Sequence, residues 1–228
     1  MDADGRVDYA AWKADDAERL AGWLSQQSAH TQGRQEALAH WINLYNAFTI
    51  QAVLQRYPIA SIRPRVLGVP NWLALLRFFS QRRHRLGARM VSLGEIEHRI
   101  LRPLGDPRIH FAIVCASIGC PLLRNEAYRP EQVEAQLEDD ARRFIGNPAK
   151  VRYDAVAHVL FCSPIFRWYQ ADFEAVAPSL AAYILPRRTT ASATAPGGLA
   201  TSGSGPHGRQ LRLRFLPYDW SLNQRTSG

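Results

Sequence analysis

The chain has 228 residues, of which 46% are hydrophobic and 21% are charged, and this composition is typical of a globular domain. No stretch approaches the roughly 18 to 20 consecutive apolar residues of a membrane-spanning helix, so a transmembrane segment is not expected. The first residues lack the basic and apolar regions of a secretory signal. We therefore expect a cytoplasmic protein, unless an upstream signal segment that would allow secretion is missing.

The net charge is +8, and nearly all of the basic residues are arginines. Positive charge is most concentrated between Arg77 and Arg108, with its peak at "RRHR", residues 82–85. A solvated surface is the preferred interpretation of this region over a phosphate-binding patch. Because no recognition helix, zinc finger or RNA-binding signature accompanies it, we do not expect a nucleic-acid partner.

The first half of the chain has the apolar spacing of helices. Residues 10–27 have an amphipathic pattern, and residues 35–58 predict the strongest helix of the protein. This second helix is apolar almost all round and stops at Pro58, which indicates a buried central helix. A short apolar helix is expected around residues 73–79.

Three polar residues, His40, Asn43 and Asn46, follow one side of the central helix. A buried amide without a hydrogen-bond partner costs about 1–3 kcal/mol, so these side chains need partners. One interpretation is a core network that pins neighbouring loops, and the other is the lining of a binding site.

A further helix is predicted to begin near Leu93, because Ser92 and Glu95 have the spacing of a capping box. Glu97 falls within the apolar face of this helix, and His98 lies on its flank. A carboxylate that faces the core needs a partner. Glu97 and His98 are therefore candidate site residues.

The stretch "RIHFAIVCASIGCP", residues 108–121, contains the central candidate. Residues 109–115 are apolar apart from His110, which is typical of a strand buried on both faces. This interpretation places Cys115 at the end of a strand. The residues "ASIG" that follow could turn and supply backbone N–H donors for an oxyanion.

Cys115 has more than one interpretation. A thiol becomes a nucleophile when a neighbouring base activates it, and His98, His110 or His40 could serve. A free cysteine is also commonly a buried and inert residue. A metal site that includes Cys120 is less favoured, because the C-x4-C spacing is wider than the usual zinc knuckle. A local disulfide between Cys115 and Cys120 in an oxidising compartment is a further alternative.

The second half of the chain alternates short helical and strand patterns. Helices are expected at residues 131–145, 165–173 and 178–185, and strands at residues 158–163 and within 210–223. Residues 189–209 consist mainly of Thr, Ser, Ala, Gly and Pro, which indicates a flexible loop or insertion. Because the last strand is too short to fold alone, it must return to the main sheet. We expect residues 1–228 to form a single α+β domain, with a helical N-terminal half packed on a small, mostly antiparallel sheet.

Six segments together have the character of a family signature. They are "VDY" (7–9), "WINLYNAFTI" (41–50), "IEHRILRP" (96–103), "DPRIHFAIVCASIGCPLLRNEAY" (106–128), "SPIFRWYQADF" (163–173) and "LPYDWSLN" (216–223). In this order they resemble the domain of unknown function 547 family of bacteria and plants, over nearly the whole chain. The plant members carry a leucine-zipper region that this chain lacks.

The resemblance implies a set of landmark positions, although it assigns no reaction to them. They are Asn43, Asn46, Glu97, His98, Arg108, His110, Cys115, Ser117, Cys120, Trp168, Tyr169 and Asp172. The chain departs from the family pattern in three places. His40 stands where an aromatic residue is common, "IGCPLL" replaces the more usual "SCPPL" form, and residues 189–209 look like an insertion.

The leading hypothesis is a thiol-dependent hydrolase or transferase that acts on an amide or thioester. Cys115 would be the nucleophile, His98 the base and Glu97 its support. The substrate would be a small molecule or a peptide, and no metal or cofactor is expected. Its candidate binding residues are Asn43, Asn46, Arg108, His110, Ser117, Trp168 and Tyr169. The alternative is a non-catalytic binding or scaffold domain whose polar cluster holds the fold or a small ligand.

Overall fold

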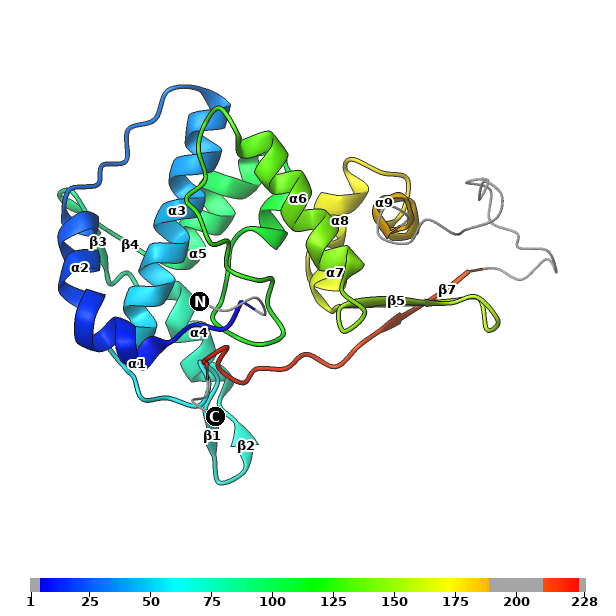
Figure 1. Ribbon diagram of the computed structural model, residues 1–228, viewed down its shortest axis with the longest axis horizontal. Coiled ribbons are helices and arrows are strands. Elements are labelled where there is room, and N and C mark those ends of the chain that lie inside the picture. The colour runs from blue at the N-terminus through cyan, green and yellow to red at the C-terminus, as the bar shows by residue number, and fades with distance from the viewer. Residues whose placement is uncertain (1–4, 189–210, 226–228) are drawn as a thin grey trace. The chain divides into compact units, whose positions relative to one another are not determined.

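The computed structural model describes residues 5–188 and 211–225, and these contain many helices and small sheets (Figure 1). The chain folds as two units. The first unit comprises Met1–Leu137 and Asp219–Gly228, and the second comprises Glu138–Tyr218. The expected flexible segment at 189–209 lies outside the described residues. None of the helices in the described ranges combines the length and the apolar character needed to span a bilayer.

Helix α3 (Gly33–Leu54) forms the centre of the first unit, as its sequence predicts (Figure 1). Its apolar side chains are buried on all sides of the helix, and Leu38, Ile42 and Val53 have no exposed surface. A helix that is hydrophobic all round must be covered all round. The prediction of a buried central helix is confirmed.

Shorter elements surround α3. They are α1 (Tyr9–Ala11), the π-helical turn η1 (Trp12–Asp16), α2 (Ala17–Ser25), β1 (Arg65–Val66), β2 (Val69–Pro70), α4 (Trp72–Ser80), β3 (His84–Leu86) and β4 (Arg89–Val91). Strands β1 and β2 form one antiparallel hairpin, and β3 and β4 form another. The helices expected at residues 10–27 and 73–79 are therefore present, although the first is divided by its π-helical turn.

The predicted capping box is confirmed at α5 (Leu93–Glu95). Ser92 Oγ accepts a hydrogen bond from Glu95 N (3.1 Å), and Ser92 N donates to Glu95 Oε2 (3.0 Å). The helix continues as the π-helical turn η2 (Ile96–Leu101) and the 3₁₀ turn η3 (Arg102–Leu104). Glu97 and His98 therefore lie on a π-helical turn.

The strand predicted at residues 109–115 is not formed, and this prediction is wrong. A 3₁₀ helix, η4 (Pro107–Phe111), begins there instead, with Asp106 as its N-cap. Beyond η4, Asn46 of α3 accepts a hydrogen bond from Val114 N and donates one to Ala112 O, both at 2.9 Å. A side chain thus supplies partners that a strand would find in a sheet.

The boundary between the two units falls within α6 (Val133–Gly146). The second unit contains β5 (Val151–Asp154), β6 (Val159–Cys162), α7 (Ile165–Trp168), α8 (Gln170–Glu174), α9 (Leu180–Arg188) and β7 (Arg212–Phe215). Strand β5 pairs antiparallel with β6, and β7 returns to pair parallel with β6. The later helices and the strands β6 and β7 agree with the prediction, whereas β5 was not predicted. The chain is an α+β protein with a helical first half and small, mostly antiparallel sheets.

Candidate functional site

Cys115 lies in a tight turn of the first unit. The next residue, Ala116, has a left-handed backbone (φ +62°), a conformation that is uncommon for any residue with a side chain. Cys115 Sγ is 3.0 Å from Ser117 Oγ, and Cys115 N donates to Cys120 Sγ at 2.8 Å. Of the three cysteines, all of them within the described ranges, Cys115 is partly exposed and the other two are buried. Burial raises the pKa of the Cys162 thiol to about 12.

The chain's C-terminal segment holds this turn, which we call the thiol turn and define as residues 112–120. Ile118 N donates to Ser221 O (2.8 Å), Gly119 N donates to Asp219 O (2.7 Å), and Asn223 N donates to Ala116 O (3.0 Å). Two N–H groups of "ASIG" are therefore used within the fold and are not directed at an oxyanion. The thiol turn depends on residues about a hundred positions away.

Tyr9 and Asn223 are neighbours of the thiol turn, and neither is among the predicted site residues. Tyr9 is buried, and its hydroxyl donates to Asn223 Oδ1 at 2.7 Å. Burial raises the pKa of Tyr9, with smaller contributions from Cys115 and Cys120, so the hydroxyl stays protonated. The segments "VDY" and "LPYDWSLN" of the family resemblance were the available signals.

Glu97 and His98 lie together, as expected from their positions on one helix. Glu97 is buried, and Tyr45 Oη donates to Glu97 Oε2 at 3.4 Å, so the carboxylate has the partner that its position requires. His98 Nδ1 is 3.9 Å from Glu97 Oε1 and accepts a hydrogen bond from Arg102 Nη1 at 3.3 Å. The His98 side chain is 53% exposed. Within the described ranges, His98 forms no direct hydrogen bond with Cys115.

Asn43 and Asn46 connect α3 to the loops beside it. Asn43 Nδ2 donates to Tyr128 O and Asn43 Oδ1 accepts from Tyr128 N, both at 2.9 Å. Asn46 makes the corresponding pair of bonds to Ala112 and Val114. The prediction that both asparagines make side-chain hydrogen bonds is confirmed, and both pin loops to the core.

Arg108 belongs to an ionic network. It binds Asp106 (2.7 Å) and Glu134, and Arg34 binds the same two carboxylates at 3.0 and 2.8 Å. Burial alone would raise the pKa of Asp106, but hydrogen bonds and charge from Arg108, together with Arg34, lower it overall. His110 is buried in η4, two residues beyond Arg108.

Trp168 and Tyr169 belong to the second unit. Trp168 ends α7 and is 45% exposed, and its ring lies 4.9 Å from that of Tyr218. Tyr169 is half-buried and joins α7 to α8. The other predicted site residues, from Asn43 to Ser117, all belong to the first unit.

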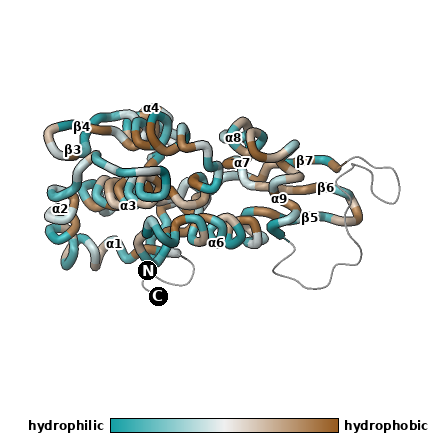
Figure 2. Tube along the Cα trace, turned by 90° about the horizontal axis from the view of Figure 1, so that it is seen from above, coloured by the Kyte–Doolittle hydropathy of each residue, from teal (hydrophilic) through white to brown (hydrophobic). Residues whose placement is uncertain are grey.

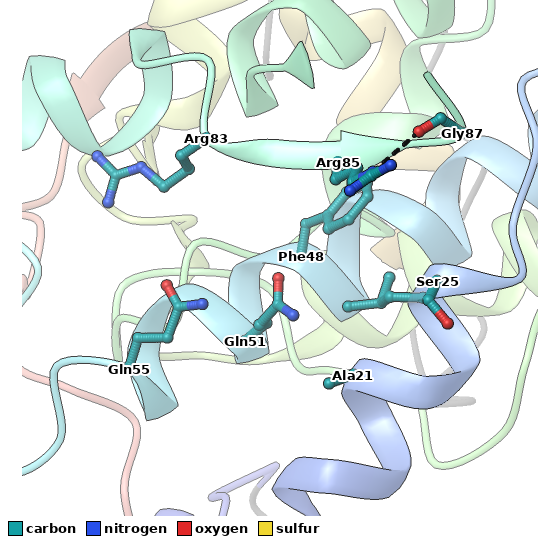
Figure 3. Close-up of a pocket in the computed structure, with 9 residues that line it drawn as sticks. Ala21, Ser25, Phe48, Gln51, Gln55, Arg83, Arg85 and Gly87 are labelled. Atoms are coloured by element: carbon teal, nitrogen blue, oxygen red, sulfur yellow. Dashed lines mark hydrogen bonds between the residues drawn. The ribbon is translucent and has the colours of Figure 1, made fainter. Parts of the chain in front are cut away.

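A separate pocket of about 570 Å³ opens in the first unit between α2, α3 and β3 (Figure 3). Gln51 and Gln55 reach it from α3, and Arg83 and Arg85 approach it from the segment of β3. Arg83 Nε is buried and has no hydrogen-bond partner among the described residues. The pocket therefore offers cationic and amide groups beside one aromatic ring, that of Phe48.

His84 lies on β3 and is almost fully buried, with its ring 4.6 Å from that of Phe48. Burial lowers the pKa of His84 to about 4, with a smaller contribution from the charge of Arg56. His84 is therefore neutral at neutral pH. No group of three or more His, Cys, Asp or Glu side chains in the described ranges is arranged to hold a metal ion.

One region of family similarity contains the thiol turn, the π-helical turn η2 and both Asn43 and Asn46 of α3. Residues 29–145 match the family described as "Protein of unknown function, DUF547". No curated protein and no solved structure matches the chain. Because the family region covers half of the sequence, the chain belongs to the DUF547 family.

Proposed function

We propose that the protein is a thiol-dependent hydrolase or transferase with Cys115 as its nucleophile, acting on an amide or thioester. The observation that carries the proposal is the setting of the thiol. Cys115 is partly exposed, it precedes a left-handed residue, and its sulfur is 3.0 Å from Ser117 Oγ. A hydroxyl at this distance can donate to a thiolate and stabilise it.

The rigidity of the thiol turn supports the same proposal. Backbone hydrogen bonds to Ser221, Asp219 and Asn223 fix the second half of the turn, and Asn46 fixes its first half. A nucleophile held in one geometry needs little reorganisation to reach its substrate.

In the proposed reaction, Cys115 gives its proton to Nδ1 of His98, and the carboxylate of Glu97, 3.9 Å from that nitrogen, stabilises the imidazolium that forms. The sulfur then adds to the carbonyl carbon of the substrate, and the amine or thiol leaves with the proton. Water or a second nucleophile releases the acyl group from sulfur. Since His98 and Cys115 share no direct hydrogen bond, one bridging water carries the proton between them. Glu97 and His98 both lie on the π-helical turn η2, and π-helical turns are frequent at functional sites.

The test compares rates of alkylation by iodoacetamide at each cysteine, in the native protein and in the urea-unfolded protein. We expect native Cys115 to react at least tenfold faster than unfolded Cys115, and native Cys120 and Cys162 to react more slowly than when unfolded. His98→Gln should lower the alkylation rate of native Cys115, whereas Arg99→Gln, one residue along the same turn, should leave that rate unchanged. A native Cys115 that reacts no faster than the unfolded one would contradict the proposal.

A second candidate is a non-catalytic binding domain, and the pocket lined by Gln51, Gln55, Arg83 and Arg85 favours it. Its volume of about 570 Å³ lies within the usual range for small-molecule sites. The arginines suit a carboxylate or phosphate, and Phe48 suits an apolar group beside it. Thermal-shift measurements with a panel of small carboxylates and phosphates test this candidate. A shift that is lost in Arg85→Gln, together with an unreactive Cys115, would favour binding over catalysis.

A further inference from the structure

The tip of the β1–β2 hairpin carries a leucine where the fold gives no reason for one. Leu67 and Gly68 form the two-residue turn, and both have positive φ, at +50° and +80°. Hairpin turns of this kind favour Asn followed by Gly, because a leucine side chain is strained in the left-handed region. Leu67 is also 98% exposed, so it contributes nothing to the core.

Leu67 is part of a larger exposed apolar surface, which we call the apolar tip. Its other members are each between 55% and 66% exposed, and they are Val66, Val69, Trp72, Leu73 and Leu76. All six residues lie on the hairpin or on α4, whose sequence is hydrophobic over most of its length (Figure 2). Figure 1 shows the hairpin projecting beside α4. Contiguous exposed apolar patches of this kind mark interaction sites.

The apolar tip is joined to the body by defined contacts. Asn71 N donates to Pro64 O at 2.8 Å, and Asn71 Oδ1 caps α4 through Ala74 N at 2.9 Å. The guanidinium of Arg63 lies over the Trp72 ring at 4.6 Å and over the Trp220 ring at 4.7 Å. The hairpin and the start of α4 are therefore held together as one surface.

The chain segment that carries the apolar tip has charge of one sign. Between residues 37 and 94 the sequence contains eight arginines and no aspartate or glutamate. Arg65 is exposed on β1, and Arg77 is exposed on α4 one residue beyond Leu76. A surface that combines exposed leucines and valines, a tryptophan and surrounding arginines is complementary to the interface of a bilayer with anionic headgroups.

We propose that the apolar tip docks this protein on the surface of a membrane that contains anionic lipids. Leu67 and its neighbours enter the boundary between headgroups and acyl chains, and Trp72 lies at headgroup level. Arg65 and Arg77 bind lipid phosphates. The strained leucine at the turn then has the bilayer as its partner in place of the core.

The experiment measures co-sedimentation of the full chain with vesicles of phosphatidylcholine containing 30% phosphatidylserine, and with vesicles of phosphatidylcholine alone. We expect binding to the anionic vesicles, weaker binding to the neutral ones, and a decrease with added salt. Leu67→Asn, which suits the turn better, should fold at least as well and bind about tenfold more weakly. Arg65→Gln and Arg77→Gln should each weaken binding about fivefold, the equivalent of about 1 kcal/mol per charge.

Two matched controls isolate the apolar tip. Val156 is 90% exposed in the turn between β5 and β6, and Val156→Asn should leave vesicle binding unchanged. Arg129 is exposed elsewhere on the first unit, and Arg129→Gln should have less than a twofold effect. These variants remove one apolar group or one charge without touching the tip.

Several results would overturn the proposal. One is equal binding of anionic vesicles by the wild type and by Leu67→Asn, and another is no binding of either vesicle. Light scattering that shows self-association abolished by Leu67→Asn would make the tip an interface between two copies of the chain. Binding of an oligonucleotide in place of vesicles, weakened by Arg65→Gln, would make the surface a nucleic-acid site.

Discussion

Helix α3 and the thiol turn are both apolar and largely buried, but their backbones are stabilised in different ways. The backbone of α3 satisfies most of its own hydrogen-bonding groups within the helix. The thiol turn makes a few local hydrogen bonds and takes the others from distant parts of the chain, through Asn46 of α3 and residues 219–223. The helix is thus locally encoded, whereas the turn that positions Cys115 exists only when distant parts of the chain are in place.

The strongest test of this difference is removal of the C-terminal segment. In a variant that ends at Tyr218, at least six backbone hydrogen bonds to the rest of the first unit are lost, together with the buried Leu222. At roughly 0.5–1.5 kcal/mol each, this loss is comparable with the stability of a whole domain. We expect the variant to lose cooperative unfolding in urea, as measured by circular dichroism.

The matched control replaces residues 189–209 with a short Gly/Ser linker. The composition of that segment predicts little buried apolar surface, and loop-closure entropy changes only slowly with length. We expect this variant to melt like the full chain. If the chain ending at Tyr218 also melted like the full chain, the C-terminal segment would be peripheral.

Asn46→Ala should destabilise the thiol turn more than α3. It leaves Ala112 O and Val114 N without their partner, and we expect a loss of about 2–4 kcal/mol in the free energy of unfolding. The amide of Val114 should lose protection against hydrogen exchange more than the amides of α3 do. Asn46→Asp keeps an acceptor for Val114 N and should retain part of that protection. Equal loss throughout α3 would show that the two regions are one cooperative unit.

His84 on β3 packs against Phe48 of α3, and its titration reports on that packing. Its pKa is about 4 in the folded protein and 6.5 in the unfolded chain, because burial disfavours the charged ring. Because the unfolded chain binds the proton first, the free energy of unfolding is unaffected by His84 above pH 6.5. It then falls by about 3 kcal/mol as the pH is lowered from 6.5 towards 4. Urea unfolding between pH 7 and pH 4 should show this loss. His84→Leu should flatten that part of the profile, and an unchanged profile would contradict burial of the ring.

Asn43→Ala is expected to have the smallest effect, a destabilisation of about 1–3 kcal/mol. Asn43 is half-buried and bonds to Tyr128, outside the thiol turn. Thermal melting should show the destabilisation, while the alkylation rate of native Cys115 stays unchanged. A large change in that rate would mean that α3 controls the thiol through both asparagines and not through Asn46 alone.

Particular residues show how far the sequence could predict this protein. Ser92 and Glu95 marked a helix start correctly, because a capping box acts within a single turn of helix. The core-facing Glu97 was correctly expected to need a partner, but nothing nearby in sequence named Tyr45. The sequence also does not predict that Tyr9 lies near Cys115 and Cys120, since they are more than a hundred residues apart along the chain.

Long or local sequence patterns are enough to predict the buried helix α3, the amphipathic helix α6 and the strand β7. The conformation of residues 109–115 depends on tertiary contacts, because a short apolar run fits a buried strand and an irregular buried segment equally well. Here the side chain of Asn46 bonds to the backbone of Ala112 and Val114, and the C-terminal segment bonds to the backbone of residues 116–119. A buried backbone must have partners, and only the folded chain settles which ones they are.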